Sequence, residues 1–285
     1  MGSSGALQTR DKKILKAAIQ RLINDFPFHG YTDRKEDAYF NVASTVMRYL
    51  PVGSKILDFG CGPCDKTVII QFLGYDCSGY DELLDEWHKL DGNRKKILNF
   101  ASAHDIDLHI GTGGDLPFDK GLFDMVMMHD VLEHLHNSPR DLLNDLLELV
   151  KPGGYFFTTV PSAVNIRKRI SVLFGNTNLP HFEGYYWNPG PWRGHVREYT
   201  KLDLILLADY LDLEILELRS CNHMLEKISP ILRNPYIWIT NIFSGFRDSW
   251  LLVARKKQNW APKRELPRED LNRILSRGTT YRYDL

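Results

Sequence analysis

Two cysteines and two glycines share one short stretch of the sequence, and each pair points to a different chemistry. The stretch KILDFGCGPCDK, residues 55–66, contains CGPC, a spacing found in redox dithiols and in half-sites for zinc. A zinc site needs two further ligands at metal spacing, and Cys77 and Cys221 each stand alone. A redox dithiol belongs to a small domain, whereas strand–helix units continue far downstream of this stretch. We therefore interpret Cys61 and Cys64 as small residues that fill a tight glycine turn.

The glycines favour a cofactor site. Asp58, Gly60 and Gly62 follow a strand-like run and precede a helix-like run, and glycine allows the backbone to approach a ligand closely. The nicotinamide fingerprint GxGxxG is incomplete, because Asp65 stands where the third glycine would be. Asp81 lies at the end of the next expected strand, where a carboxylate can bind both hydroxyls of a ribose.

Histidines and carboxylates form a second candidate site. The stretch HDVLEHLH, residues 129–136, begins at the end of the fourth expected strand, where ligands bind in open α/β sheets. A long loop downstream ends in GHVREYT and can carry His195 into the same place. His195 or His134 can then act as a general base for a hydroxyl, or both can join Asp130 and Glu133 around a divalent metal that lowers the pKa of the acceptor. A purely structural role, fixing the loops, stays open for Glu133, His134 and His195.

The elements that position these residues alternate along the chain. Short apolar runs are separated by helical segments, which predicts a parallel sheet with helices on both faces. Ser138 and Pro139 predict the start of one helix, the glycines of PGG at 152–154 predict its end, and His136 is expected to be exposed just before it. The expected strands are KILDFG, YDCSGYD, DLHIG, FDMVMMHD, GYFFTTVP, LEILELRS and SWLLVARK.

Segments outside this alternation suggest a division of the chain. Residues from 11 to about 50 have helical periodicity, and residues 162–199 are too long and too rich in aromatics, Gly, Pro and Asn for a plain connector. Residues 222–248 form a second expected insertion. This insertion can lie on a membrane, at a dimer interface or over the sheet, and we prefer the position over the sheet. The predicted parts are an N-terminal helical cap (1–50), a main domain (51–257) with a substrate lid (162–199) and a helical insertion (222–248), and a polar, loosely attached tail (258–285).

Five motifs in order resemble the class I S-adenosylmethionine-dependent methyltransferases over residues 55–256. They are ILDFGCG, SGYD, GGDLPF, FDMVMMHDVLEHL and LLELVKPGGYFFTTVP. The resemblance implies a Rossmann-like, seven-stranded, mostly parallel sheet whose last strand is antiparallel. The departure is Pro63 and Cys64 in the first turn, and a proline is tolerated at a helix start.

The resemblance also implies roles for individual residues. The first motif would cradle the methionine end of the cofactor, the acidic end of the second motif would bind its ribose, and the third would lie near its adenine. The implied cofactor contacts are Asp58, Gly60, Cys61, Gly62, Asp81, Glu82, Asp115, Leu116 and His129. The pattern of Asp130, Glu133 and His134 is similar to that of ubiquinone-pathway O-methyltransferases and small-RNA 3′-end methyltransferases, and that similarity implies an Mg or Mn site completed by His195.

Composition sets the remaining expectations. The chain has 285 residues with 36 basic and 36 acidic side chains, so net charge gives no indication of a nucleic-acid partner. Four cysteines are too few for a secreted disulfide framework, the polar N-terminus predicts no signal peptide, and no apolar run predicts stable membrane insertion. We expect a cytoplasmic enzyme and make no prediction of its oligomeric state.

The predicted reaction is methyl transfer from S-adenosylmethionine to a small molecule or glycan. We expect a hydroxyl oxygen to be methylated by in-line displacement with a histidine base, because a hydroxyl acceptor benefits most from a base. The alternatives are N- or C-methylation, an NAD(P)-dependent oxidoreductase, which Asp65 argues against, and a cofactor-binding protein without catalytic activity.

Overall fold

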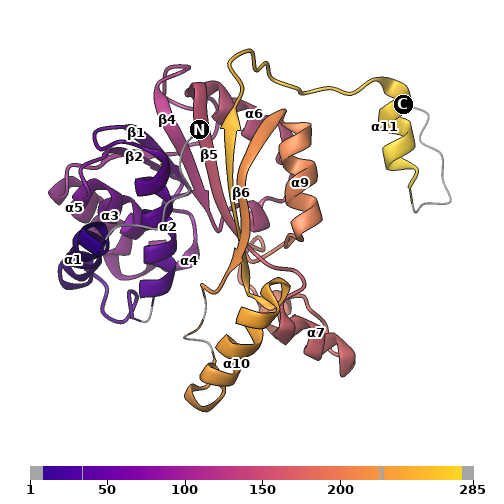
Figure 1. Cartoon of the computed structure of the whole chain (residues 1–285), viewed down its shortest axis with the longest axis horizontal. Helices are drawn as coiled ribbons and strands as arrows, with labels where there is room; N and C mark the ends of the chain where they lie inside the picture. Colours follow the sequence, from indigo (N-terminus) through magenta and orange to yellow (C-terminus); the bar gives the residue numbers. More distant parts are fainter. Residues whose placement is uncertain (1–8, 34, 224, 226–227, 278–285) are drawn as a thin grey trace.

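One mixed sheet organises the protein. The computed structural model describes residues 9–33, 35–223, 225 and 228–277. Its seven-stranded sheet has the order β3-β2-β1-β4-β5-β7-β6 (Figure 1). The strands are β1 (Lys55–Phe59), β2 (Asp76–Asp81), β3 (Asp107–Ile110), β4 (Phe123–His129), β5 (Val150–Pro161), β6 (Leu213–Cys221) and β7 (Ser249–Lys256). Each lies at one of the runs that the sequence predicted.

Strand direction confirms the expected topology. Neighbours from β3 to β5 pair in parallel, whereas β7 pairs antiparallel with both β5 and β6. The central strands are apolar along nearly their whole length, as in β4, because helices cover both faces of a parallel sheet. The carboxyl ends of β1, β2 and β4 therefore meet at one edge of the sheet.

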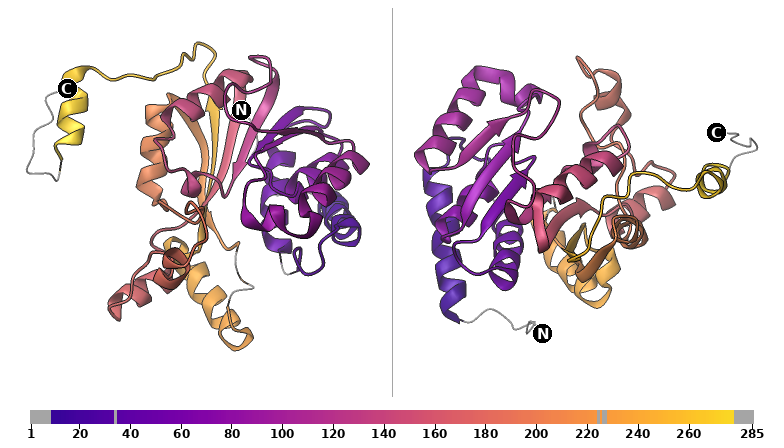
Figure 2. Two further views of the ribbon diagram at one scale, coloured as in Figure 1. Left: turned by 180° about the vertical axis from the view of Figure 1, so that it is seen from behind. Right: turned by 90° about the horizontal axis from the view of Figure 1, so that it is seen from above.

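Helices pack on both faces. Ile56 of β1 belongs to a core shared with α1, α2, α3 and α5, whereas the next residue, Leu57, belongs to a core shared with α6 and α9. These helices lie on opposite faces of the sheet (Figures 1 and 2). Their bounds are α1 (Thr9–Asp25), α2 (Glu36–Tyr49), α3 (Asp65–Phe72), α5 (Asn93–Ala103), α6 (Arg140–Leu149) and α9 (Lys201–Tyr210), with the short α4 (Glu86–Lys89) and η1 (Leu90–Gly92) before α5.

Two predicted helix boundaries are wrong in detail. The helical region expected from 11 to about 50 is broken between α1 and α2, where Pro27 removes a backbone donor and Gly30 adopts a φ of +79°. The PGG stretch at 152–154 does not end α6, because α6 ends at Leu149 and β5 begins at Val150. The start of α6 is close to the predicted one at Ser138 and Pro139. The helix begins at Arg140, whose N–H donates to Ser138 Oγ at 3.4 Å.

Two insertions project from the carboxyl edge of the sheet. The segment 162–199 contains α7 (Ile166–Leu173) and α8 (Phe182–Tyr186), and the segment 222–248 contains α10 (Pro230–Ile242) and η4 (Ser244–Phe246). Helices α7 and α10 extend from the same end of the molecule (Figures 1 and 2). The division into cap, main domain and tail stays a prediction, and 1–8, 34, 224, 226–227 and 278–285 of those ranges lie outside the described residues.

Candidate functional site

A cavity of about 1300 Å³ opens at the carboxyl ends of β1, β2 and β4. Most of the predicted cofactor residues line it, although they come from four separate parts of the sequence. They are Gly60, Cys61, Gly62, Asp81, Glu82, Asp115, Leu116 and His129, and the predicted catalytic residue His134 lines the same cavity. Asp58, Glu133 and His195 do not line it.

Asp81 holds the glycine turn in place. Its Oδ2 accepts a hydrogen bond from the Gly62 N–H at 2.8 Å, and its Oδ1 accepts one from the Leu83 N–H at 2.7 Å. Each carboxylate oxygen keeps capacity for a further donor, so a ribose hydroxyl can be accommodated. Gly60 has a φ of +74°, and a Cβ there would lie 2.3 Å from Val131 Cγ2, so only glycine fits at this point. The turn and the carboxylate therefore fit a nucleoside cofactor.

Asp58 lies behind the turn. Its carboxylate is 2% exposed and accepts a hydrogen bond from Thr67 Oγ1 at 2.7 Å. Burial raises the pKa of Asp58 to about 6. The predicted cradle role of Asp58 is thus indirect in this geometry, because the side chain supports the first turn of α3.

The two cysteines of CGPC face each other in the core. Their sulfur atoms lie 3.7 Å apart, and both residues are buried free thiols. The hydrogen bond between the two thiols, together with burial, raises the pKa of Cys61 well above its ordinary value. A reactive dithiol needs the opposite shift, so this geometry agrees with a glycine turn filled by small residues.

Charged and polar residues from α2, from α3 and from the end of β4 form one wall of the cavity. Lys66 Nζ lies 3.0 Å from Asp130 Oδ2, and the Tyr39 hydroxyl donates to Asp65 Oδ2 at 2.7 Å. Burial opposes ionisation of Asp130, but Lys66 outweighs it and lowers the pKa of Asp130 to about 2. Asp130 is therefore an ion-paired wall residue rather than a member of the histidine group. Its φ of +58° turns it toward Lys66, a feature that only tertiary structure reveals.

Two buried histidines add to this wall. The Nε2 atoms of His129 and His223 have no hydrogen-bond partner among the residues that the structure describes. Burial lowers the pKa of both rings, so both are neutral at pH 7. His223 follows β6, outside any motif, and the sequence offered no signal for it.

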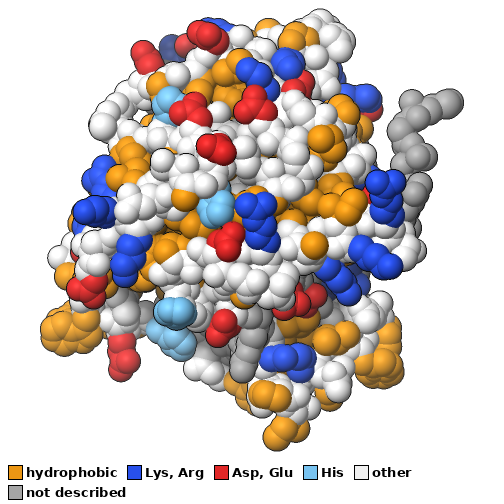
Figure 3. Space-filling view, turned by 90° about the vertical axis from the view of Figure 1, so that its left-hand side faces the viewer, with side chains coloured by type: hydrophobic (Ala, Val, Ile, Leu, Met, Phe, Trp, Pro, Cys, Tyr) orange, Lys and Arg blue, Asp and Glu red, His pale blue; other side chains and the backbone are white. Residues whose placement is uncertain are grey.

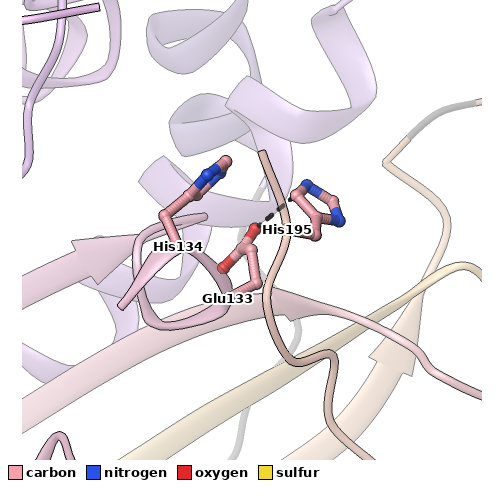
Figure 4. Close-up of side chains that lie close together, drawn as sticks. All are labelled: Glu133, His134 and His195. Atoms are coloured by element: carbon pink, nitrogen blue, oxygen red, sulfur yellow. Dashed lines mark ion pairs between the residues drawn. The ribbon is translucent and has the colours of Figure 1, made fainter. Parts of the chain in front are cut away.

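Glu133, His134 and His195 form a compact group beside the cavity (Figure 4). One ligand atom from each lies within 4.8 Å of the other two, and His195 Nε2 is 3.9 Å from Glu133 Oε1. His195 Nδ1 also lies 2.9 Å from Glu198 Oε1. Glu133 and His134 come from η2 (Leu132–His134), whereas His195 comes from the end of the lid segment, as the sequence predicted it could.

Glu133 is the most buried member of this group. The residue is 1% exposed, and neither carboxyl oxygen has a hydrogen-bond partner in the described part of the chain. Burial and the nearby charge of Asp130 raise the pKa of Glu133 to about 8. At neutral pH the carboxyl group is therefore mostly protonated.

The lid is tied to the η2 loop through two histidines. His134 Nδ1 lies 2.6 Å from the Arg193 carbonyl oxygen, and His136 Nε2 lies 2.7 Å from the Trp192 carbonyl oxygen. A carbonyl oxygen only accepts, so each of these nitrogens carries a proton. In its neutral form, His134 then presents an unprotonated Nε2, the state that a base requires. His136 is exposed, as expected, and has this additional role in holding the lid.

Known proteins with similar sequences are methyltransferases. A family model described as a methyltransferase domain matches residues 33–218, more than half of the chain. An uncharacterized methyltransferase from Schizosaccharomyces pombe is 32% identical over 117 residues, which cover 39% of this chain and 41% of the relative. A ubiquinone biosynthesis O-methyltransferase from Shewanella pealeana is 31% identical over 131 residues, which cover 43% of this chain and 50% of the relative. The matched region thus spans half or less of these curated relatives.

Solved structures show the same fold at low identity. A SAM-dependent methyltransferase from Methanosarcina mazei is 14% identical with a TM-score of 0.52, over 75% of this chain and 97% of that one. The [4+2]-cyclase SpnF is also 14% identical, with a TM-score of 0.53 over 87% of this chain and 95% of that one. These two structures support the fold alone, and the family match carries the assignment. Together with the motifs that predicted it, that match shows that the protein belongs to the S-adenosylmethionine-dependent methyltransferases.

Proposed function

We propose that the protein methylates a hydroxyl oxygen of a small molecule or glycan and that His134 is the general base. S-adenosylmethionine supplies an electrophilic methyl group when bound. The observation that carries the proposal is the hydrogen bond from His134 Nδ1 to the Arg193 carbonyl, which leaves Nε2 free to accept a proton at the cavity. A base of this kind contributes about 10²–10⁴-fold to the rate.

The rest of the cavity supports the same assignment of roles. Asp81 and the glycine turn fit the ribose end of the cofactor, and Asp115 and Leu116 lie in the same cavity for its adenine. Trp192 from the lid supplies an aromatic wall suited to a sugar or a planar acceptor. The similarity to a ubiquinone biosynthesis O-methyltransferase favours an oxygen acceptor over nitrogen or carbon.

His195 and Glu133 act in this proposal as positioning residues. The His195 ring packs edge-on against His134, with the ring centroids 4.9 Å apart, and Glu198 fixes its other side. Neither His195 nor Glu133 lines the cavity, so both act on the acceptor through His134.

The test replaces His134 in two ways. Asparagine keeps an N–H near the position of Nδ1 and can still hold the lid, but it removes the base, whereas alanine removes both. We expect His134→Asn to lower methyl transfer to phenol and sugar acceptors by about 10²-fold or more. S-adenosylhomocysteine should bind His134→Asn with unchanged affinity.

The control is His136→Gln, which keeps an N–H near the position of Nε2. It should retain turnover, because glutamine keeps the hydrogen bond to the Trp192 carbonyl, and His136, which also lines the cavity, takes no part in proton transfer in this proposal. Equal turnover in wild type and His134→Asn would show that His134 is not the base.

A divalent metal at Glu133, His134 and His195 is the second candidate for the same group. The observation that favours it is the convergence of three ligand atoms, including a buried carboxyl group without a partner. Mg or Mn would supply a positive charge that lowers the pKa of an acceptor hydroxyl. Asp130 would not take part, because it is paired with Lys66.

Chelation separates the two candidates. With a histidine base alone, EDTA leaves methyl transfer unchanged. Loss of activity that Mg²⁺ or Mn²⁺ restores, together with Mn²⁺ binding that Glu133→Gln abolishes, would instead establish the metal.

The free thiols agree with a reducing compartment, so we keep the cytoplasm as the proposed location.

A further inference from the structure

The helices that project beyond the cavity carry unusually exposed apolar side chains. Six of them define the surface that we call the apolar tips. They are Leu173, Phe174, Phe182, Trp187, Ile231 and Trp238, each between 67% and 85% exposed. Large apolar side chains exposed on projecting helices indicate a place of contact with another molecule or a membrane.

The tips lie at one end of the molecule. Helices α7 and α10 extend in the same direction from the carboxyl edge of the sheet (Figures 1 and 2). In Figure 3, which keeps the vertical direction of Figure 1, hydrophobic side chains gather along the lower edge. The tips can therefore meet one extended surface together.

Positive charge accompanies the tips. Helices α7 and α10 contain no Asp or Glu, whereas they carry Arg167, Lys168, Arg169 and Arg233. Lys168 is ion-paired with Glu198, and Nε of Arg167 and Nε and Nη2 of Arg233 are buried, so these atoms do not face solvent. Arg169 is exposed, and Arg167 and Arg233 are partly exposed. The guanidinium donors that reach the surface suit phosphate oxygens. α8 contributes one acid, Glu183, so the surface is basic on balance.

We propose that the apolar tips dock on a lipid bilayer that contains anionic phospholipid. Exposed aliphatic side chains would enter the boundary between headgroups and acyl chains, Trp187 and Trp238 would lie at that boundary, and the arginines would meet the phosphates. The docking is peripheral, because no helix in the described parts of the chain is long and apolar enough to cross a membrane.

The charge argues against a second copy of the chain as the occupant. A twofold contact between two sets of tips would bring the α7 and α10 cations of both copies together, and like charges across an interface oppose association. A bilayer with anionic headgroups satisfies both the apolar and the cationic side chains.

Docking would also place the cavity at the bilayer. Trp192 and Arg193 follow α8 by a few residues, and His223 precedes α10, and all three line the cavity. The inference goes beyond the proposed function and does not depend on it, because membrane binding can be measured without cofactor or acceptor.

The experiment is flotation of the purified full chain with vesicles. One set contains phosphatidylcholine alone and the other a mixture with phosphatidylglycerol. We expect binding to the mixed vesicles that weakens as salt is raised, because screening reduces attraction between the cations and the headgroups. The double variant Leu173→Asp/Trp238→Asp should lower the partition coefficient by about tenfold or more, since each change removes apolar area from the contact.

The matched control is Val52→Asp. Val52 is 72% exposed but precedes β1, at the opposite edge of the sheet from the tips. It should bind vesicles like wild type, and thermal unfolding should show that both variants are folded. Absence of binding to either vesicle, or equal loss in the control, would overturn the proposal. So would a lipid-free dimer that the double variant dissociates, seen by analytical ultracentrifugation.

Discussion

The carboxyl group of Glu133 shows how one residue can link stability to pH. The pKa of Glu133 is raised from 4.5 to about 8, mainly by burial. A folded-state pKa above the unfolded value means that the folded protein binds the proton more tightly. The resulting stabilisation is complete below the unfolded pKa and is lost as pH rises through about 8.

Glu133→Gln tests this link, because glutamine keeps the shape and cannot ionise. The difference in melting temperature, wild type minus Glu133→Gln, should fall as pH rises from 4.5 to about 8. The exposed Glu265 provides the control as Glu265→Gln, for which the difference should stay flat. A difference that is constant with pH for Glu133→Gln as well would mean that Glu133 is ionised in the folded protein.

Asp81 carries the cofactor assignment at the residue scale. Asp81→Asn leaves one acceptor oxygen where the wild type has two, so the turn and the ribose compete for it. We expect the affinity for S-adenosylhomocysteine to fall about tenfold to a hundredfold, measured by isothermal titration calorimetry. Asp76→Asn, at the exposed start of the same strand, should bind like wild type. Equal affinity in both variants would mean that Asp81 does not contact the ribose.

At the scale of elements, the turn between β1 and α3 forms part of the cavity wall. Gly60 and Gly62 both have positive φ, but only a Cβ at Gly60 meets a neighbour, Val131 Cγ2 at 2.3 Å. Gly60→Ala should therefore cost about 2 kcal/mol or more in the free energy of unfolding, against about 1 kcal/mol for Gly62→Ala. Urea unfolding of both variants measures the difference, and equal costs would contradict close packing of Gly60 on Val131.

The strands were predictable because short strand-like runs alternate with helical segments, and the central ones are mostly apolar. FDMVMMHD is buried nearly throughout, and its sequence alone predicts a central strand. The PGG stretch at 152–154 was misread because glycine usually ends a helix, whereas here Gly153 lies inside β5 with a φ of +78°. Local propensity does not distinguish a helix end from an irregular strand start.

The candidate site was predictable only in part. The glycine turn, Asp81 and the η2 histidines belong to ordered motifs at strand ends, so the sequence marked them. The pairing of Lys66 with Asp130 and the burial of His223 depend on contacts between distant parts of the chain. The same is true of the hydrogen bonds that join His134 and His136 to the lid. No spacing in the sequence records such contacts.

At the scale of the whole molecule, the cavity described above, the lid and the apolar tips lie at one end of the sheet. The cavity, the lid and the apolar tips all follow the carboxyl ends of strands. At the opposite edge, short connections lead into β1, β2, β5 and β6, and α11 (Arg268–Leu275) extends away from the body (Figure 1). A cofactor bound deep in the cavity would thus be reached from the side of the lid and the tips.

Isothermal titration of the wild-type chain with S-adenosylhomocysteine, and in parallel with NAD, tests the central claim most directly. Asp81, the closely packed Gly60 and the missing third glycine at Asp65 predict saturable binding of S-adenosylhomocysteine at one site, and no binding of NAD. Binding of NAD in place of S-adenosylhomocysteine would contradict the assignment of this cavity.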